Sequence, residues 1–168
     1  MRIKKVKLTS DKKILIIYEK KPNTGAKDYD EYSLSCSEEA RPEFYKSMER
    51  LALHVVKMCE LPQEYIDRIV VKGVTFSYAG QAEVMGATIT AQMKLEESYQ
   101  NLNLNTPYKA SGSYSEAPAD PKQILDFRCI ADLKYLQSEC ELYINGDRSQ
   151  GRLFNTETLN QVAATTLN

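Results

Sequence analysis

Residues 87–95 alternate in polarity with a period of two, and no other feature of the sequence restricts the fold as much. Ala87, Ile89, Ala91, Met93 and Leu95 alternate with Thr88, Thr90, Gln92 and Lys94. This alternation predicts a strand with one face in the core and the other in water. A β-favouring run, residues 69–78, precedes it across a turn at Ala79 and Gly80. Two strands joined by so short a turn are antiparallel, so we expect a hairpin here.

The first 36 residues predict three more strands. β-favouring residues fill 2–8 and 13–20, and the turn between them covers 9–12. A third run, residues 29–36, alternates apolar and polar side chains in the same way. The chain therefore begins with a hairpin followed by another strand.

Two segments carry apolar residues at helical spacing. The first spans about 42–60, with Pro42 at the first helical position. The second runs from the N-cap pair Asp120 and Pro121 to a cap at Asn145 and Gly146. The order β-β-β-α-β-β-α predicts an α+β fold, an antiparallel sheet of about five strands with two helices packed on one face.

A length of 168 residues suits a single domain with one core. We expect that α+β domain to be 1–146, with 147–168 forming a C-terminal docking segment and tail. Residues 99–119 are rich in Asn, Ser, Pro and Tyr and predict a long loop, in which Leu102 and Leu104 add a short edge segment. The sequence shows neither a signal peptide nor an apolar run of membrane-spanning length, which favours a cytoplasmic protein.

Residues that would support catalysis are few. The one histidine, His54, lies in the middle of the first predicted helix and is interpreted as a boundary residue. Glycine-rich phosphate loops and the usual hydrolase and metalloprotease motifs are missing from the sequence. We therefore expect a protein that is not an enzyme and has no cofactor and no metal. The widely spaced cysteines predict reduced core residues: Cys36, Cys59, Cys129 and Cys140.

Charge is distributed unevenly along the chain. Nine Lys or Arg side chains stand between Arg2 and Lys27 against Asp11 and Glu19, a net charge of +7, so the rest of the chain carries −8. A basic N-terminal hairpin can meet nucleic acid or an acidic partner. The candidate phosphate-facing side chains are Lys4, Lys5, Lys7, Lys12 and Lys13. The alternative is that these lysines only keep an exposed edge strand soluble.

Aromatic residues and a cation gather in the long loop. Tyr99, Tyr108 and Tyr114 lie there beside Lys109. Aromatic rings interleaved with cations stack unpaired bases, and tyrosine is also favoured at protein interfaces. The loop is therefore a candidate contact for single-stranded DNA or for another protein. A second copy of the chain is a further candidate partner of the protein as a whole.

The C-terminal stretch RSQGRLF contains Gln150, Leu153 and Phe154 in the pattern QxxLF. This pattern resembles the short peptide, commonly QLxLF, with which bacterial replication and repair proteins dock on the β sliding clamp. The resemblance implies that Leu153 and Phe154 enter an apolar pocket and that Gln150 supplies hydrogen bonds. Gly151 stands where the clamp peptide usually has Leu. The alternative is that Leu153 and Phe154 pack back on the domain as a C-terminal clip.

A wider resemblance is carried by five stretches, which are ARPEFYKSMERLALHVVKMCELP, VVKGVTFSYAGQAEVMGATITAQMKL, LNLNTPYK, GSYSEAPADP and ELYINGDRSQGRLF. They resemble a group of small, largely uncharacterised proteins from phages and prophages of Gram-positive bacteria. The resemblance implies a phage context, in which small non-enzymes commonly serve DNA replication or recombination, or antagonise host defences.

These observations lead to one main hypothesis, a phage DNA replication or recombination accessory protein that contacts DNA or a replication partner and docks on the sliding clamp. The first alternative is an inhibitor of a host defence nuclease, such as a CRISPR effector, in which acidic side chains including Glu96, Glu97 and Glu116 occupy a nucleic-acid channel. The second alternative is a nuclease with a metal site assembled from scattered carboxylates.

Overall fold

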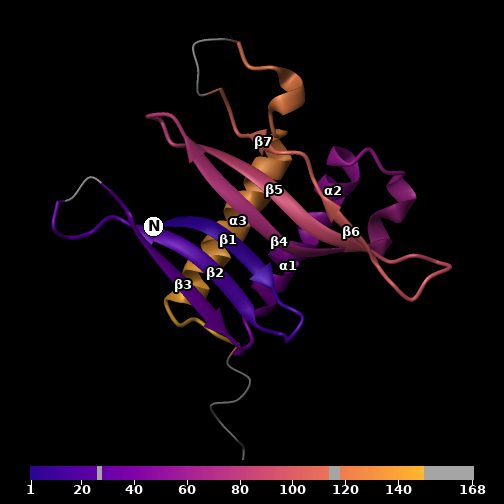
Figure 1. Ribbon diagram of the computed structural model, residues 1–168, viewed down its shortest axis with the longest axis horizontal. Coiled ribbons are helices and arrows are strands. Elements are labelled where there is room, and N and C mark those ends of the chain that lie inside the picture. Colours follow the sequence, from indigo (N-terminus) through magenta and orange to yellow (C-terminus); the bar gives the residue numbers. More distant parts are fainter. Residues whose placement is uncertain (26–27, 114–117, 150–168) are drawn as a thin grey trace, which may run out of the picture.

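The protein is an antiparallel sheet covered on one face by helices, in a computed structural model that describes residues 1–25, 28–113 and 118–149 (Figure 1). The strands are β1 (Arg2–Leu8), β2 (Ile14–Lys20), β3 (Asp30–Cys36), β4 (Ile69–Ala79), β5 (Val84–Met93), β6 (Leu102–Asn105) and β7 (Lys109–Ala110). The α-helices are α1 (Pro42–Arg50), α2 (Ala52–Met58) and α3 (Phe127–Ile144), and two 3-10 helices are η1 (Gln63–Arg68) and η2 (Pro121–Gln123). The α+β class and the antiparallel sheet are confirmed.

The order of strands across the sheet is β3-β2-β1-β4-β5-β6. β7 pairs with the beginning of β5, at Gly86 and Ala87. Every neighbouring pair of strands is antiparallel. The chain thus leaves the sheet at β3, forms α1 and α2, passes over β2 and β1, and returns as β4 beside β1. β1 is a central strand, so the alternative that its lysines protect an edge strand is wrong.

The core lies between the sheet and the helices. Val74 and Phe76 of β4 and Ala87 and Ile89 of β5 are buried, as the period-two pattern predicts. Figure 1 shows α1, α2 and α3 together behind the sheet. The opposite face carries no helix in the described part of the chain.

The first predicted helix is divided in two, and its prediction as one helix over 42–60 is wrong. Leu51 separates α1 from α2, and its backbone N–H donates to the carbonyl of Met48, three residues back, at 3.1 Å. That tighter turn shifts the direction of the helical face. The Leu51 side chain is fully buried at this point, so packing against the core favours the break.

The second predicted helix starts later than the Asp120 and Pro121 pair suggests. Those residues begin only the 3-10 turn η2, and the chain then becomes extended because the N–H of Leu125 donates to the carbonyl of Ala110 at 2.8 Å. Asp126 is the N-cap of α3, and its Oδ1 accepts from the N–H of Cys129 at 2.7 Å. Pairing with β7 therefore takes residues 124 and 125 out of the helix. The predicted edge segment at Leu102 and Leu104 is confirmed as β6.

His54 is not a boundary residue, as the sequence suggested, but a core residue with 1% of its surface exposed. Its Nε2 lies 2.8 Å from Oδ2 of Asp132 on α3, which is itself buried. A buried imidazole is tolerated because this carboxylate satisfies one ring nitrogen. The pair joins α2 to α3 across 78 residues of sequence.

The four cysteines are free thiols, with Cys129 and Cys140 buried and Cys36 and Cys59 half-buried. Within the described ranges, no helix is long and apolar enough to span a bilayer.

Candidate functional site

One face of the sheet, which no helix covers within residues 1–25, 28–113 and 118–149, brings several predicted nucleic-acid contacts together. Residues directly opposite each other on paired strands share a face. Lys5 is opposite Ile17 of β2 and Thr75 of β4, and Thr75 is opposite Thr88 of β5. We call this surface the open face, and its central residues are Lys5, Lys7, Thr75, Ser77, Thr88, Thr90 and Asn105.

The predicted lysines differ in whether their ammonium groups form ion pairs. Lys4 Nζ is 3.5 Å from Glu19 Oε1, and Lys13 Nζ is 3.2 Å from Asp11 Oδ2. Lys12 is exposed in the β1–β2 turn, with a φ of 60°. Lys5 and Lys7 form no ion pair with any residue that the structure describes. Their ammonium groups are therefore free to meet an external anion.

Tyr108 joins the lysines on the open face. Ser77 Oγ donates to its hydroxyl at 3.1 Å, and a Cβ at Gly86 would collide with its ring. Gly86 is opposite Ser77 in the β4–β5 ladder, so the ring lies over the open face at this point. Ser77 is two residues from Thr75, the partner of Lys5, which places its Cα on the order of 8 Å from the Cα of Lys5. Tyr108 remains 46% exposed.

The other predicted contacts lie elsewhere. Tyr99 is fully exposed in the loop between β5 and β6. Lys109 lies on the helix side of the sheet, where it lines a pocket. Tyr114 lies outside the described residues. The sequence predicted that Tyr99, Tyr108 and Lys109 share one loop surface. In the structure, Tyr108 is separated from both Tyr99 and Lys109.

The nuclease-inhibitor and metal-nuclease hypotheses both depend on acidic side chains. Those that the structure describes do not form a cluster. Glu96 is 3.4 Å from Arg68 and Glu97 is exposed, while Glu116 falls outside the described residues. Within residues 1–25, 28–113 and 118–149, no group of three or more His, Cys, Asp or Glu side chains is placed to hold a metal ion.

The predicted docking residues Gln150, Leu153 and Phe154 lie outside the described residues, but the chain leading to them is well fixed. Arg148 Nε donates to Glu38 Oε2 at 2.8 Å, and its guanidinium lies 3.6 Å from the centre of the Tyr143 ring. The N–H of Ser149 donates to the carbonyl of Glu39 at 3.1 Å. The docking segment therefore starts from a fixed point beside the beginning of α1.

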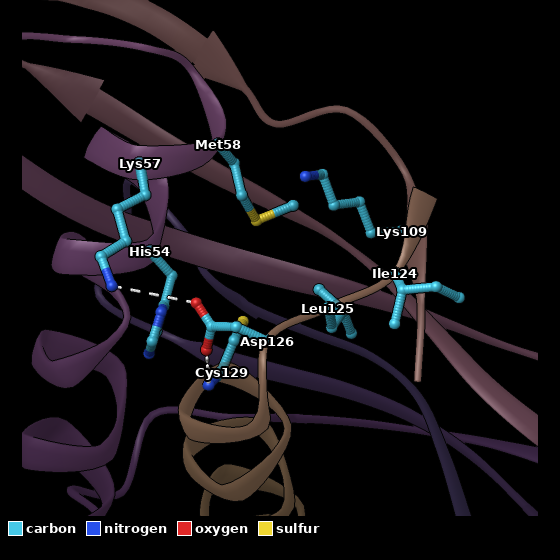
Figure 2. A pocket seen from close by; sticks show the side chains of 8 residues that line it. All are labelled: His54, Lys57, Met58, Lys109, Ile124, Leu125, Asp126 and Cys129. Carbon is cyan, nitrogen blue, oxygen red and sulfur yellow. Dashed lines mark hydrogen bonds and ion pairs between the residues drawn. The ribbon is translucent and has the colours of Figure 1, made fainter. Parts of the chain in front are cut away.

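A small pocket lies on the helix side, where the end of α2 meets the start of α3. Its cavity has a volume of about 110 Å³. We call it the α2–α3 pocket, and its walls are His54, Lys57, Met58, Lys109, Ile124, Leu125, Asp126 and Cys129 (Figure 2). In Figure 2 the Lys109 side chain extends toward Met58, and the Asp126 carboxylate faces Lys57.

The pocket wall contains both hydrogen-bond donors and groups that can accept a hydrogen bond. Lys57 and Lys109 can only donate hydrogen bonds. His54 Nε2 is engaged by Asp132, and its Nδ1 is buried without a hydrogen-bond partner in the described part of the chain. Asp126 Oδ2 is 3.9 Å from Lys57 Nζ, beyond the length of a hydrogen bond.

Cys129 is the one thiol in the pocket wall. Burial raises its pKa to about 12, and the nearby carboxylates of Asp126 and Asp132 act in the same direction. The thiol therefore stays protonated at neutral pH, whereas a reactive cysteine needs its thiolate. The geometry of the pocket suits binding of a ligand more than attack on one.

Sequence reasoning did not find the α2–α3 pocket. Its walls come from α2, β7 and the start of α3, which only the fold brings together. The local signal was the pair His54 and Lys57, spaced three apart on a helix that is otherwise apolar. No family model, curated protein or solved structure matches the chain. The function is therefore argued from these two surfaces.

Proposed function

We propose that the protein is a non-enzymatic phage accessory protein of DNA replication or recombination that binds a single DNA strand on the open face. The observation that carries this proposal is the presence of Lys5, Lys7 and the Tyr108 ring on one uncovered face of the sheet. Two ammonium groups without carboxylate partners in the described chain stand beside an exposed aromatic ring there.

The chemistry of the open face fits a single strand. Lysine ammonium groups neutralise phosphates, and the ring of Tyr108 offers a surface for one unpaired base, a contact worth about 1–3 kcal/mol. The threonine, serine and asparagine side chains around them supply neutral hydrogen bonds to sugars and bases. A sheet of this many strands is too wide to enter a duplex groove as a helix or a two-stranded ribbon does, so unpaired bases are the better fit.

The C-terminal segment supplies the link to replication in this proposal. Burying Leu153 and Phe154 in a pocket of the β sliding clamp is worth roughly 3–6 kcal/mol. Since an affinity of 1 μM corresponds to about −8 kcal/mol, and ordering the segment has a cost, we expect the clamp to bind no tighter than micromolar even with the hydrogen bonds of Gln150. The N–H of Ser149, which immediately precedes the segment, donates to the carbonyl of Glu39. One molecule can then hold DNA and the clamp together.

DNA binding is tested by fluorescence anisotropy with a labelled single-stranded oligonucleotide at several salt concentrations. We expect log affinity to fall by about 0.7 per neutralised phosphate against log salt. The double variant Lys5→Met/Lys7→Met should reduce that slope by about 1.4. Lys46→Met, at an exposed position on α1, is the matched control and should leave it unchanged. Undetectable or salt-independent binding would rule out the open face as a DNA-binding surface.

Clamp docking is tested by pull-down with purified sliding clamp. The variant Leu153→Ala/Phe154→Ala should lose the clamp and keep the melting temperature of the parent protein. Retained capture together with a large drop in melting temperature would identify the segment as a clip on its own domain.

A further inference from the structure

The strand β3 forms one border of the sheet (Figure 1). It has seven residues and, within the described residues, pairs with β2 alone. Its outward backbone N–H and C=O groups therefore have no strand beside them in the described part of the chain. The opposite border is formed by β6 and β7, which have only four and two residues. β3 is thus the longer stretch of unpaired edge.

The edge of β3 lacks the usual protection. Edge strands commonly carry lysine, proline or a bulge, which prevent pairing with another chain. The sequence of β3, DEYSLSC, contains neither lysine nor proline, and its pairing with β2 is regular along its whole length. Tyr32 lies on the helix side of the sheet, where its ring stacks on Tyr18 with the ring centres 5.4 Å apart. The Tyr32 side chain is still 44% exposed.

We propose that β3 binds a second copy of this chain, with the two β3 strands antiparallel and centred on Ser33. This register pairs every residue of one β3 with a residue of the other. It also keeps the open faces of both copies on the same side of the joined sheet. A shift by one residue would place polar side chains of one copy opposite apolar side chains of the other.

The charges of β3 favour this arrangement. Glu31 lies opposite Ser35 of the second copy, and Asp30 lies opposite Cys36 of the second copy. No two carboxylates of the paired strands therefore face each other. A parallel arrangement in register would place each carboxylate beside its own counterpart, which is destabilising. The acidic residues thus select the antiparallel pairing.

The apolar side chains of β3 meet in the same register. Tyr32 lies opposite Leu34 of the second copy, and the symmetry makes this cross-strand pair occur twice. Pairs of an aromatic and an aliphatic side chain stabilise antiparallel strands. The second copy therefore covers the exposed ring of Tyr32.

The pairing joins the two open faces. Ser33 is opposite Ile17, and Ile17 is opposite Lys5, so these three residues form one row across the sheet. The row continues through Ser33 of the second copy to its Lys5. Five strand spacings of about 4.8 Å place the two Lys5 residues about 24 Å apart. The pairing does not depend on the proposed function, whereas its use as one continuous DNA-binding surface rests on that function.

Self-association is measured by sedimentation velocity over a range of protein concentrations, without DNA and at low salt. Seven paired residues form a smaller contact than the interface of about 1,200–2,000 Å² in a stable complex, so we expect a dimer that dissociates on dilution. Ser33→Lys places two ammonium groups face to face and should raise the dissociation constant several-fold. Ser35→Lys, also at an exposed position, meets Glu31 of the second copy and should lower it. A monomer at every concentration, or an equal effect of the two variants, overturns the inference.

The register is tested by disulfide formation under mild oxidation. In Ser33→Cys the two thiols are opposite each other, with Cα atoms about 4.5–5.5 Å apart, a separation that a disulfide bridges. Ser35→Cys is the matched control, because its two thiols lie four residues apart along the strands, roughly 13 Å. We expect a covalent dimer from Ser33→Cys and much less from Ser35→Cys or from the parent protein. Equal yields from the two variants overturn the proposed register.

The covalent Ser33→Cys dimer separates pairing from DNA binding. A single-stranded oligonucleotide long enough to cover both open faces should bind this dimer at least about tenfold more tightly than it binds the reduced monomer at low protein concentration. A short oligonucleotide that covers one open face should bind both forms equally. Equal affinity of the long oligonucleotide for both forms overturns the shared surface. If neither form binds DNA but the dimer forms as expected, the proposed function fails and the pairing stands.

Discussion

Removal of the Asp132 carboxylate tests whether the buried contact between α2 and α3 stabilises the protein. In Asp132→Ala, His54 keeps its place in the core, with 1% of its surface exposed, and loses the acceptor 2.8 Å from Nε2. A buried donor left unsatisfied costs about 1–3 kcal/mol. Because the lost acceptor is a carboxylate, we expect the free energy of unfolding to fall by about 2–3 kcal/mol, in the upper part of this range.

The assay is urea unfolding followed by far-ultraviolet circular dichroism. The m-value should stay constant, since the surface exposed on unfolding hardly changes. Asp132→Asn retains an oxygen that accepts from Nε2 and should cost about 1 kcal/mol. Ser138→Ala, at an exposed position of α3, is the control and should change the free energy of unfolding by less than about 0.5 kcal/mol.

The double variant His54→Leu/Asp132→Leu separates the contact from the cavity. Replacing both members of a buried polar pair by apolar residues is often nearly neutral, so it should be more stable than Asp132→Ala. If Asp132→Ala is as stable as the Ser138→Ala control, the contact contributes nothing and the reasoning fails.

Two further predictions concern helix capping and alkaline stability. Asp126→Ala should lower the free energy of unfolding by about 1 kcal/mol, because it removes the N-cap bond to Cys129. Asp120→Ala affects only the short η2 turn, so its loss in free energy of unfolding should be less than about half that of Asp126→Ala. A larger loss for Asp120→Ala than for Asp126→Ala in urea unfolding would contradict the observed start of α3. Burial raises the pKa of Tyr78 to about 12 from its usual value of 10.0, so the unfolded chain loses this proton first. The free energy of unfolding should therefore fall between about pH 10 and 12. In Tyr78→Phe it should fall less steeply over the same range. An identical pH dependence in the variant would show that the phenol does not contribute.

The alternation of polar and apolar residues predicts the strands well because the signal is local. Each of Val74, Phe76, Ala87 and Ile89 lies on the buried side, as the period of two requires. The start of α3 was predicted too early because Asp120 and Pro121 form a good local cap. The backbone bond from Leu125 to Ala110 extends the chain there, and its partner is fifteen residues back in the sequence.

The candidate sites depend on contacts between distant parts of the chain, so the sequence revealed only some of their members. Lys5 and Lys7 were predicted from charge, but their position in the centre of the sheet follows from the pairing of β1 with β4. The burial of His54 depends on Asp132, 78 residues later. The apolar neighbours Leu53 and Val55 do not reveal this partner, so the sequence alone did not place the histidine in the core.

The central position of β1 also affects how the protein is made. Lys5 pairs with Thr75, so β1 waits for about seventy more residues before its second neighbour, β4, has been synthesised. At translation rates of about 5–20 residues per second, the wait is roughly 4–14 s. During this time one side of the N-terminal hairpin is unpaired, and Lys5 and Lys7 give it a positive charge that repels identical nascent chains. The two lysines that we assign to DNA would then also oppose aggregation of nascent chains.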